Sequence, residues 1–157
     1  MKFYDREKEI AQLRQWEELS LEYAQMTVVV GRRRIGKTTL IKKAMEGRMT
    51  LYFFVAKKNE TLLCEEFVEL IRVVLNVKIV GQLTDFKSIF EYLMQLSTER
   101  HFTLIIDEFQ EFFNINSSVY SDMQNIWDTY RKKSKMNLIV SGSVYSLMQK
   151  IFQNNKE

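Results

Sequence analysis

The sequence predicts an α/β fold, in which helices cover both faces of a parallel sheet as a three-layer α/β/α arrangement. The chain has 157 residues, of which 46% are apolar, enough for one hydrophobic core but short for two. Four short apolar runs, rich in β-branched and aromatic residues, have the length of buried strands. Segments of helical periodicity separate the runs, and strands that alternate with helices are typical of parallel sheets.

The predicted strands are four to six residues long and cover residues 26–30, 50–55, 102–106 and 137–140. Helices are predicted over residues 5–21 and 37–45. Four further sets of apolar residues recur at spacings of three and four, which places each set on one helix face. These sets are Leu63, Phe67, Leu70, Ile71 and Val74; Phe86, Ile89, Phe90 and Leu93; Val119, Met123, Ile126, Trp127 and Tyr130; and Val144, Leu147, Met148, Ile151 and Phe152.

Composition excludes several classes of protein. No apolar run approaches the roughly 18 residues of a membrane-spanning helix, and the first residues lack the apolar run of a signal peptide. We therefore expect a soluble, cytoplasmic protein without a membrane partner. Cys64 is the only cysteine and His101 the only histidine, which argues against a disulfide framework, a Cys/His zinc site and a Ser-His-Asp triad with a second histidine. Catalysis would use carboxylates, hydroxyls, lysine or a bound metal.

Positive charge is concentrated in one segment. The net charge is only +3, yet residues 31–48 hold seven basic residues and one acid, Glu46. A compact anion such as a nucleotide phosphate suits a local positive field better than a long nucleic acid, which needs a basic face spread over many turns.

A phosphate-binding loop is predicted directly after the first strand. The segment from Gly31 to Thr38 reads GRRRIGKT and matches GxxxxGK[ST] between a strand and a helix. Backbone N–H groups would surround phosphate oxygens, Lys37 would reach the β- and γ-phosphates, and Thr38 would ligate Mg²⁺. The alternative is a basic surface turn, which needs neither both glycines nor the Lys-Thr pair. The predicted nucleotide-binding residues are Gly31, Arg32, Arg33, Arg34, Ile35, Gly36, Lys37, Thr38 and Thr39.

The roles of the three loop arginines stay open. They could contact phosphate or a neighbouring subunit, or they could simply be solvated loop residues.

Two carboxylates follow the third predicted strand. In a parallel sheet Asp107 and Glu108 would lie at the same edge as the phosphate loop. Asp107 would hold Mg²⁺ through a water, and Glu108 could polarise the attacking water. Without the loop, such a pair would read as an ordinary strand exit, and Glu111 nearby could be a solvated helix charge. At the end of the fourth strand, Ser141 could sense the γ-phosphate and orient the water, or cap the next helix.

These segments resemble a known family, the prokaryotic AAA+-type P-loop ATPases of the archaeal ATPase group, which are related to the STAND signalling ATPases. The likeness spans nearly all of the chain and rests on FYDREKEIAQL, VVVGRRRIGKTTLI, YFFVAKKNE, LIIDEFQEF and LIVSGSVYSLMQKIF, in that order. It implies the P-loop NTPase fold, ATP or ADP with Mg²⁺, and an opening segment beside the adenine, where Tyr4 and Arg6 would flank the base. An ordinary helix start is the alternative for that segment.

The resemblance also implies parts that this chain lacks. The family normally continues with a Gly-Arg element, a fifth strand beside the phosphate-loop strand, a helical lid and often a nuclease-like C-terminal domain, whereas this sequence stops at Glu157. We therefore expect residues 1–157 to be an ATPase core truncated before the fifth strand, with an N-terminal helical segment (1–25) and a nucleotide-binding core (26–157). A protein partner or a homo-oligomer is expected, and nucleic acid only through the missing C-terminal domain.

The predicted function is an ATP-binding, Mg²⁺-dependent ATP hydrolase core that couples nucleotide binding and hydrolysis to a conformational switch. Lys37, Glu108 and Ser141 are its predicted catalytic residues. The alternative is a nucleotide-dependent signalling or interaction module with negligible hydrolysis. A small-molecule phosphotransferase is disfavoured because no acceptor-binding lid is visible, and a DNA-binding module without nucleotide chemistry is disfavoured by the confinement of the charge.

Overall fold

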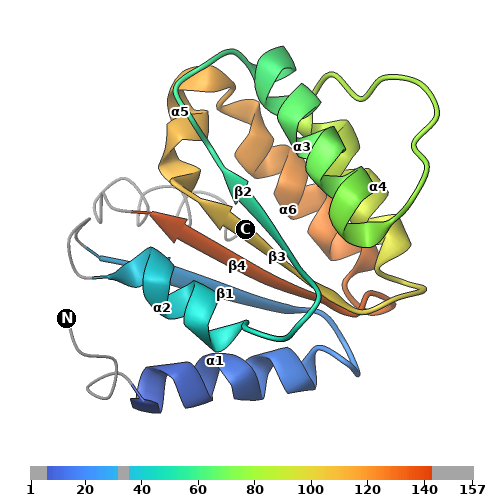
Figure 1. Cartoon of the computed structure of the whole chain (residues 1–157). Helices are drawn as coiled ribbons and strands as arrows, with labels where there is room; N and C mark the ends of the chain where they lie inside the picture. The colour runs from blue at the N-terminus through green and yellow to red at the C-terminus, as the bar shows by residue number, and fades with distance from the viewer. Residues whose placement is uncertain (1–6, 32–35, 143–157) are drawn as a thin grey trace.

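The fold is built on a four-stranded parallel sheet with the strand order β1-β4-β3-β2 (Figure 1). A computed structural model describes residues 7–31 and 36–142. The strands are β1 (Gln25–Val30), β2 (Thr50–Phe54), β3 (Phe102–Asp107) and β4 (Met136–Gly142). Their limits differ from the predicted ones by at most two residues, and all three pairings are parallel. The predicted sheet is confirmed.

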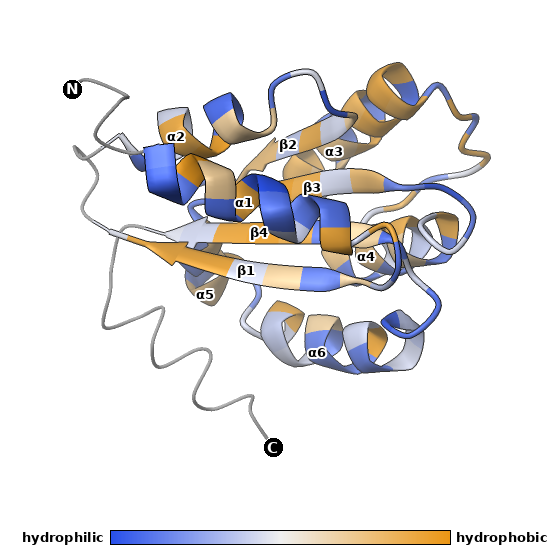
Figure 2. Cartoon of the chain, turned by 90° about the horizontal axis from the view of Figure 1, so that it is seen from below, coloured by the Kyte–Doolittle hydropathy of each residue, from blue (hydrophilic) through white to orange (hydrophobic). Residues whose placement is uncertain are grey.

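Helices cover both faces of this sheet, which confirms the three-layer prediction. α1 (Glu7–Leu19) and α2 (Lys37–Ala44) lie on one face, while α3 (Glu60–Leu75), α4 (Phe86–Leu96) and α6 (Ser118–Tyr130) lie on the other. Figure 2 shows α1 crossing the sheet with hydrophilic residues on its outer side. The set from Val144 to Phe152 lies outside the described residues.

One short segment was not predicted. A 3₁₀ turn, η2 (Phe109–Glu111), and a short helix, α5 (Phe112–Ile115), follow β3 and lead into α6. They turn the chain just after Glu108 and bring Phe109 and Phe112 into the core. A segment this short has too few residues to show a helical period.

The two faces of the sheet have separate cores because side chains alternate along each strand. On β3, Leu104 and Ile106 pack with α3, α4 and α6, whereas Ile105 packs with α1 and α2. The larger core is aromatic, with the rings of Phe53 and Phe67 stacked at 4.1 Å between centroids. All residues of β3 and β4 are buried, as central strands of a covered sheet require.

Within the described residues, the predicted helix faces are confirmed, with one correction on α3. Leu63, Phe67 and Ile71 are buried as predicted, but Leu70 is 38% exposed. The buried stripe of α3 is centred on the three residues named first, so Leu70 lies on its flank toward solvent.

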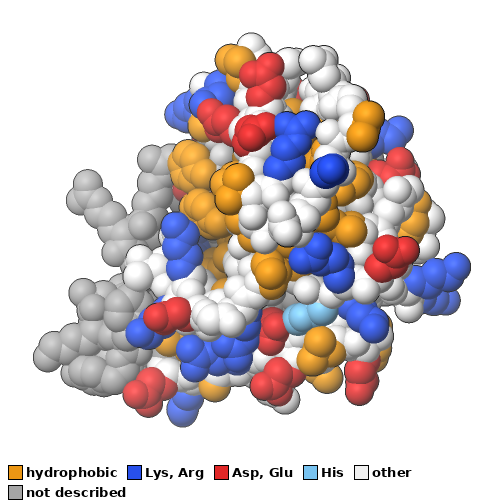
Figure 3. Space-filling view, turned by 45° about the vertical axis from the view of Figure 1, so that its right-hand side comes forward, with side chains coloured by type: hydrophobic (Ala, Val, Ile, Leu, Met, Phe, Trp, Pro, Cys, Tyr) orange, Lys and Arg blue, Asp and Glu red, His pale blue; other side chains and the backbone are white. Residues whose placement is uncertain are grey.

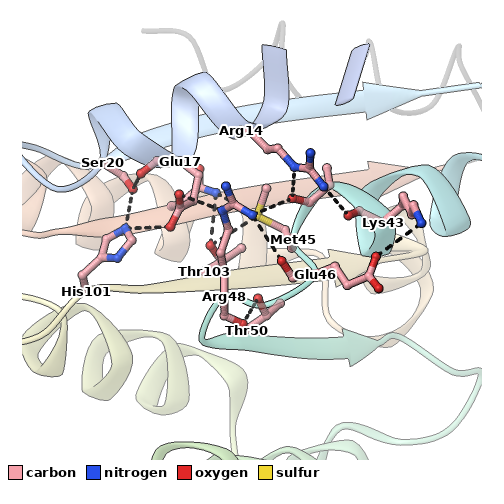
Figure 4. Close-up of polar contacts among 12 residues, drawn as sticks. Arg14, Glu17, Ser20, Lys43, Met45, Glu46, Arg48, Thr50, His101 and Thr103 are labelled. Carbon is pink, nitrogen blue, oxygen red and sulfur yellow. Dashed lines mark hydrogen bonds and ion pairs between the residues drawn. The ribbon is translucent and has the colours of Figure 1, made fainter. Parts of the chain in front are cut away.

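Polar contacts at the far end of α2 hold this helix against α1 and the sheet (Figure 4). Arg14 of α1 donates from Nε to the Ala44 carbonyl (3.1 Å) and from Nη2 to the Lys43 carbonyl (3.3 Å). Arg48 pairs with the buried Glu17 of α1 at 3.1 Å. Carbonyls at a helix C-terminus carry partial negative charge, so the guanidinium of Arg14 is favourably placed.

Removing the Arg14 contact is expected to destabilise the protein modestly. Arg14→Ala deletes two hydrogen bonds to carbonyls at the C-terminus of α2, and we expect the free energy of unfolding to fall by about 1–2 kcal/mol. Urea denaturation of the parent, Arg14→Ala and the control Gln15→Ala would measure this. Gln15 is an exposed neighbour on α1, and equal stabilities of all three proteins would contradict the assigned role.

β1 lies at an edge of the described sheet, where β4 is its only partner among residues 7–31 and 36–142. Met26 and Val28 of β1 are 38% and 41% exposed. This is the edge at which the resemblance places a further strand, and that strand stays a prediction.

The surface shows no sign of an extended basic face in the view that Figure 3 draws. There, among the residues that the structure describes, basic side chains are interspersed with acidic and hydrophobic ones. None of the described helices has the length and apolar character to cross a membrane.

Candidate functional site

The two glycines of the predicted phosphate loop occupy its two ends. Gly31 directly follows β1, and its N–H donates to the Gly142 carbonyl of β4 (3.3 Å). Gly36 is the N-cap of α2 and has a left-handed backbone with φ 73°, a conformation that glycine adopts without a Cβ clash. The loop therefore ends at a helix N-terminus whose N–H groups favour an anion. Arg32, Arg33, Arg34 and Ile35 lie outside the described residues.

Lys37 is a buried cation at the first position of α2. Lys37 is only 4% exposed. No carboxylate forms an ion pair with Lys37 within residues 7–31 and 36–142. A buried charge without a partner is costly, so this position is chemically suited to an anionic ligand. Thr39, two residues further along α2, is exposed.

Asp107, the last residue of β3, is the centre of a dense hydrogen-bond network. Its Oδ2 accepts from the Thr38 hydroxyl (2.8 Å) and from the Tyr52 hydroxyl (2.5 Å). Its Oδ1 accepts from the Ser141 hydroxyl (2.6 Å) and from the backbone N–H of Glu108 (2.9 Å). α2, β2 and β4 thus each contribute one donor to the carboxylate that ends β3.

This network keeps Asp107 ionised. Burial alone would raise the pKa of its carboxyl, but the hydrogen bonds from Ser141, Tyr52 and Thr38, together with that from the Glu108 N–H, lower the pKa below its ordinary value. Burial and the bond to Asp107 raise the pKa of the Tyr52 phenol. Tyr52 therefore remains a hydrogen-bond donor at neutral pH.

Glu108 has an unusual backbone. It adopts the left-handed region with φ 56° and ψ 43°, which costs a non-glycine residue about 1 kcal/mol. Its Oε2 accepts from the Gln110 Nε2 at 2.5 Å, and Gln110 is buried. Strain of this kind often collects at functional sites, and here it sits directly beside Asp107.

Thr38 and Asp107 together fit a magnesium ion. Both supply the hard oxygen atoms that Mg²⁺ prefers. Thr38 donates its only hydroxyl proton to Asp107, which leaves its oxygen lone pairs for a ligand. The described residues contain no cluster of three or more His, Cys, Asp or Glu side chains suited to a metal. Magnesium held by one or two protein groups, with phosphates and waters as its other ligands, suits such a sparse set.

Of the predicted site residues that the structure describes, most lie at one edge of the sheet. Gly36, Lys37 and Thr38 begin α2, while Asp107 and Glu108 end β3. Ser141 lies beside them but is fully buried, and its hydroxyl donates a hydrogen bond to Asp107. Its contact with a γ-phosphate therefore stays a prediction. Tyr4 and Arg6 lie outside the described residues.

Sequence reasoning missed Tyr52 and Gln110. In the sequence Tyr52 belongs to the apolar run of a predicted strand, whereas alternation along β2 places it on the same face of the sheet as Asp107. The position of Gln110 depends on the 3₁₀ turn after Glu108, for which the sequence carries no glycine or proline signal.

Comparison with known proteins gives a family match over nearly the whole chain. A family described as an ATPase domain predominantly from Archaea matches residues 3–157. An uncharacterized protein of Methanocaldococcus jannaschii is 31% identical over 146 residues, which are 93% of this chain and 30% of that protein. The chain therefore spans less than a third of that relative's length.

Solved structures share the fold. Cdc6p from Pyrobaculum aerophilum superposes with a TM-score of 0.68 at 15% identity, over 99% of this chain and 44% of that protein. A Walker-type ATPase of Pyrococcus abyssi superposes with a TM-score of 0.67 at 20% identity, over 94% of this chain and 47% of that protein. Drosophila ORC bound to DNA superposes with a TM-score of 0.56 at 11% identity, over 95% of this chain and 27% of that chain. At these identities the likeness establishes the P-loop NTPase fold alone.

Proposed function

Because the chain belongs to the family of ATPase domains found predominantly in Archaea, we propose that it binds ATP and ADP with Mg²⁺, hydrolyses ATP, and couples both events to a conformational switch. One observation carries this proposal. Lys37 is a buried cation at a helix N-terminus, next to a glycine loop, and no described carboxylate pairs with it. Phosphate oxygens would supply the missing negative charge.

Each residue of the site has a proposed task. The backbone from Gly31 to Thr38 surrounds the phosphates, and Lys37 reaches the β- and γ-phosphates. Thr38 and Asp107 hold Mg²⁺, which when bound neutralises charge on the phosphates. Glu108 polarises the attacking water, since its carboxylate follows Asp107 directly at the same edge.

The remaining predicted contacts also stand as proposals. Tyr4 and Arg6 flank the adenine, and Arg32, Arg33 and Arg34 contact phosphate or a neighbouring subunit. Ser141 orients the water, and Thr39 belongs to the nucleotide-binding segment. We place the protein in the cytoplasm, with another protein or further copies of itself as partner, and propose no contact between residues 1–157 and nucleic acid.

A specific contact favours the second candidate function, a nucleotide-dependent signalling module with negligible hydrolysis. The carboxylate of Glu108 accepts a hydrogen bond from the buried Gln110. A base held in this way is less able to accept a proton from water. Turnover therefore separates the two candidates, whereas both require nucleotide binding.

Calorimetric titration with ADP, ATP and GTP, each with Mg²⁺ and with EDTA, tests the proposed function. We expect ADP and ATP to bind and Mg²⁺ to strengthen binding. If none of these nucleotides binds to the folded protein, the proposal is wrong. GTP reports on base preference in the same experiment.

Asp107→Asn is expected to remove most of the strengthening by magnesium. The neutral amide attracts the cation less, so we expect the gain in ADP affinity on adding Mg²⁺ to fall by about 10-fold or more. Asp128→Asn, an exposed acid of α6, serves as the control. A gain in Asp107→Asn equal to that of the control would contradict the metal-binding role.

A further inference from the structure

The Asp107 carboxylate has as many donors as it has acceptor positions. A carboxylate offers about four lone-pair sites, and four donors occupy them, namely Thr38, Tyr52, Ser141 and the N–H of Glu108. Magnesium, bound directly or through a water, needs one of these sites. One donor therefore has to leave when the metal is bound.

Three of the four donors are poorly placed to leave. The Glu108 N–H belongs to the backbone immediately after β3. Ser141 is fully buried on the central strand β4. Thr38 is the second residue of α2, and its oxygen can bind a metal while its hydroxyl still donates to Asp107.

Tyr52 is the donor whose hydrogen bond to Asp107 can be displaced. It lies on β2, an edge strand of the described sheet, and it is only partly buried. The Lys42 ammonium lies 4.1 Å from the centre of its ring, a contact that involves the face of the ring and leaves the hydroxyl free to turn. The Tyr52 hydroxyl donates to Oδ2 of Asp107, the same oxygen that accepts a hydrogen bond from Thr38, the predicted metal ligand.

We propose that the Tyr52 hydroxyl competes with magnesium for Asp107. This inference rests on the proposed function. The opposite reading, that Tyr52 orients Asp107 for the metal, is weaker because three other donors already fix the carboxylate. Loss of the fourth leaves its direction set and frees an acceptor site. Tyr52 thus lowers the affinity for magnesium and stabilises the metal-free site.

Tyr52→Phe tests this proposal because it removes the hydroxyl and keeps the ring over which Lys42 lies. Calorimetry with ADP over a range of Mg²⁺ concentrations gives the apparent magnesium affinity, which we expect to increase about three- to tenfold, the scale of one lost charge-assisted hydrogen bond. ADP affinity in EDTA should be unchanged. Tyr130→Phe, which removes a hydroxyl bonded to Gln95 far from the site, should match the parent in both conditions.

A spectroscopic measurement on the parent protein keeps the test independent of the variant's folding. With tyrosine labelled uniformly with ¹³C and ¹⁵N, the Tyr52 Cζ resonance, assigned in the parent protein by through-bond correlation to its own backbone, should move when Mg²⁺ is added to the ADP complex. An unchanged or weaker magnesium affinity in the variant, or a stationary resonance, would overturn the proposal. ADP binding in EDTA separates this failure from that of the proposed function, because the proposed function requires that the nucleotide bind and the proposal about Tyr52 concerns only its magnesium dependence.

Discussion

Lys37→Ala is expected to weaken ADP binding by about 2–4 kcal/mol, the usual effect of deleting one partner of a buried charge pair. At about 1.4 kcal/mol per factor of ten, this is a loss of about 30- to 700-fold in affinity. The loss should appear with Mg²⁺ and with EDTA alike, because in the proposed site the ammonium binds phosphate rather than the metal. Calorimetric titration of both proteins with ADP measures it.

The control for this experiment lies on the same helix. Lys43 is half exposed and pairs with Glu46 at the far end of α2, so Lys43→Ala should bind ADP like the parent. The stability of ligand-free Lys37→Ala should be equal to or higher than that of the parent, because the substitution removes a buried charge with no described acid partner. A folded Lys37→Ala protein with parental ADP affinity would refute the proposed function.

Glu108→Gln is expected to leave ATP bound and to slow hydrolysis by about 10²-fold or more, the scale of lost general-base catalysis. Glutamine preserves the size of the side chain but cannot accept the proton of the attacking water. Single-turnover hydrolysis of ATP and ATP affinity, measured on the same preparation, separate chemistry from binding.

Glu111→Gln provides the comparison for Glu108, since Glu111 is the acid at the other end of the same 3₁₀ turn. It should hydrolyse ATP at the parental rate. Equal rates for parent and Glu108→Gln would show that Glu108 does not activate the water. A parent already as slow as Glu108→Gln would favour the signalling module, in which Gln110 restrains the carboxylate.

Local patterns were sufficient to predict the described strands and the longer described helices, but not η2 and α5. The apolar run of β3 predicts the limits of this strand to within one residue. The periodic set of α4 predicts a helix face whose four residues are all buried. Both patterns do so because burial requires a regular spacing on a strand or a helix. The strand order could not be obtained in this way, since periodicity identifies which residues are buried and not which strands are neighbours.

The site was predictable in part for similar reasons. Lys37 and Thr38 belong to a contiguous motif, and Asp107 follows an apolar strand, so each carried a local signal. Tyr52 did not, because its role depends on register. Phe54 pairs with Asp107, which puts Tyr52 diagonally opposite that carboxylate on the same face, within reach of a long side chain.

The backbone of Glu108 shows a different limit. Left-handed backbone is usually signalled by glycine or asparagine, as at Gly36, Gly47 and Gly81. Glu108 adopts it without such a residue. Local backbone propensity therefore does not predict this conformation at Glu108.

The position of β4 sets the order in which the chain can assemble. β4 is the last strand described, yet it lies between β1 and β3 and is the only partner of β1 in the described sheet. β2, β3 and the helices between them are contiguous in the sequence and can fold together first. During synthesis, β1 has no partner among the described strands until residues 136–142 emerge from the ribosome. Parallel pairings across such separations form slowly, so we expect the β1–β4 edge, from which the predicted phosphate loop leaves, to form only late in folding.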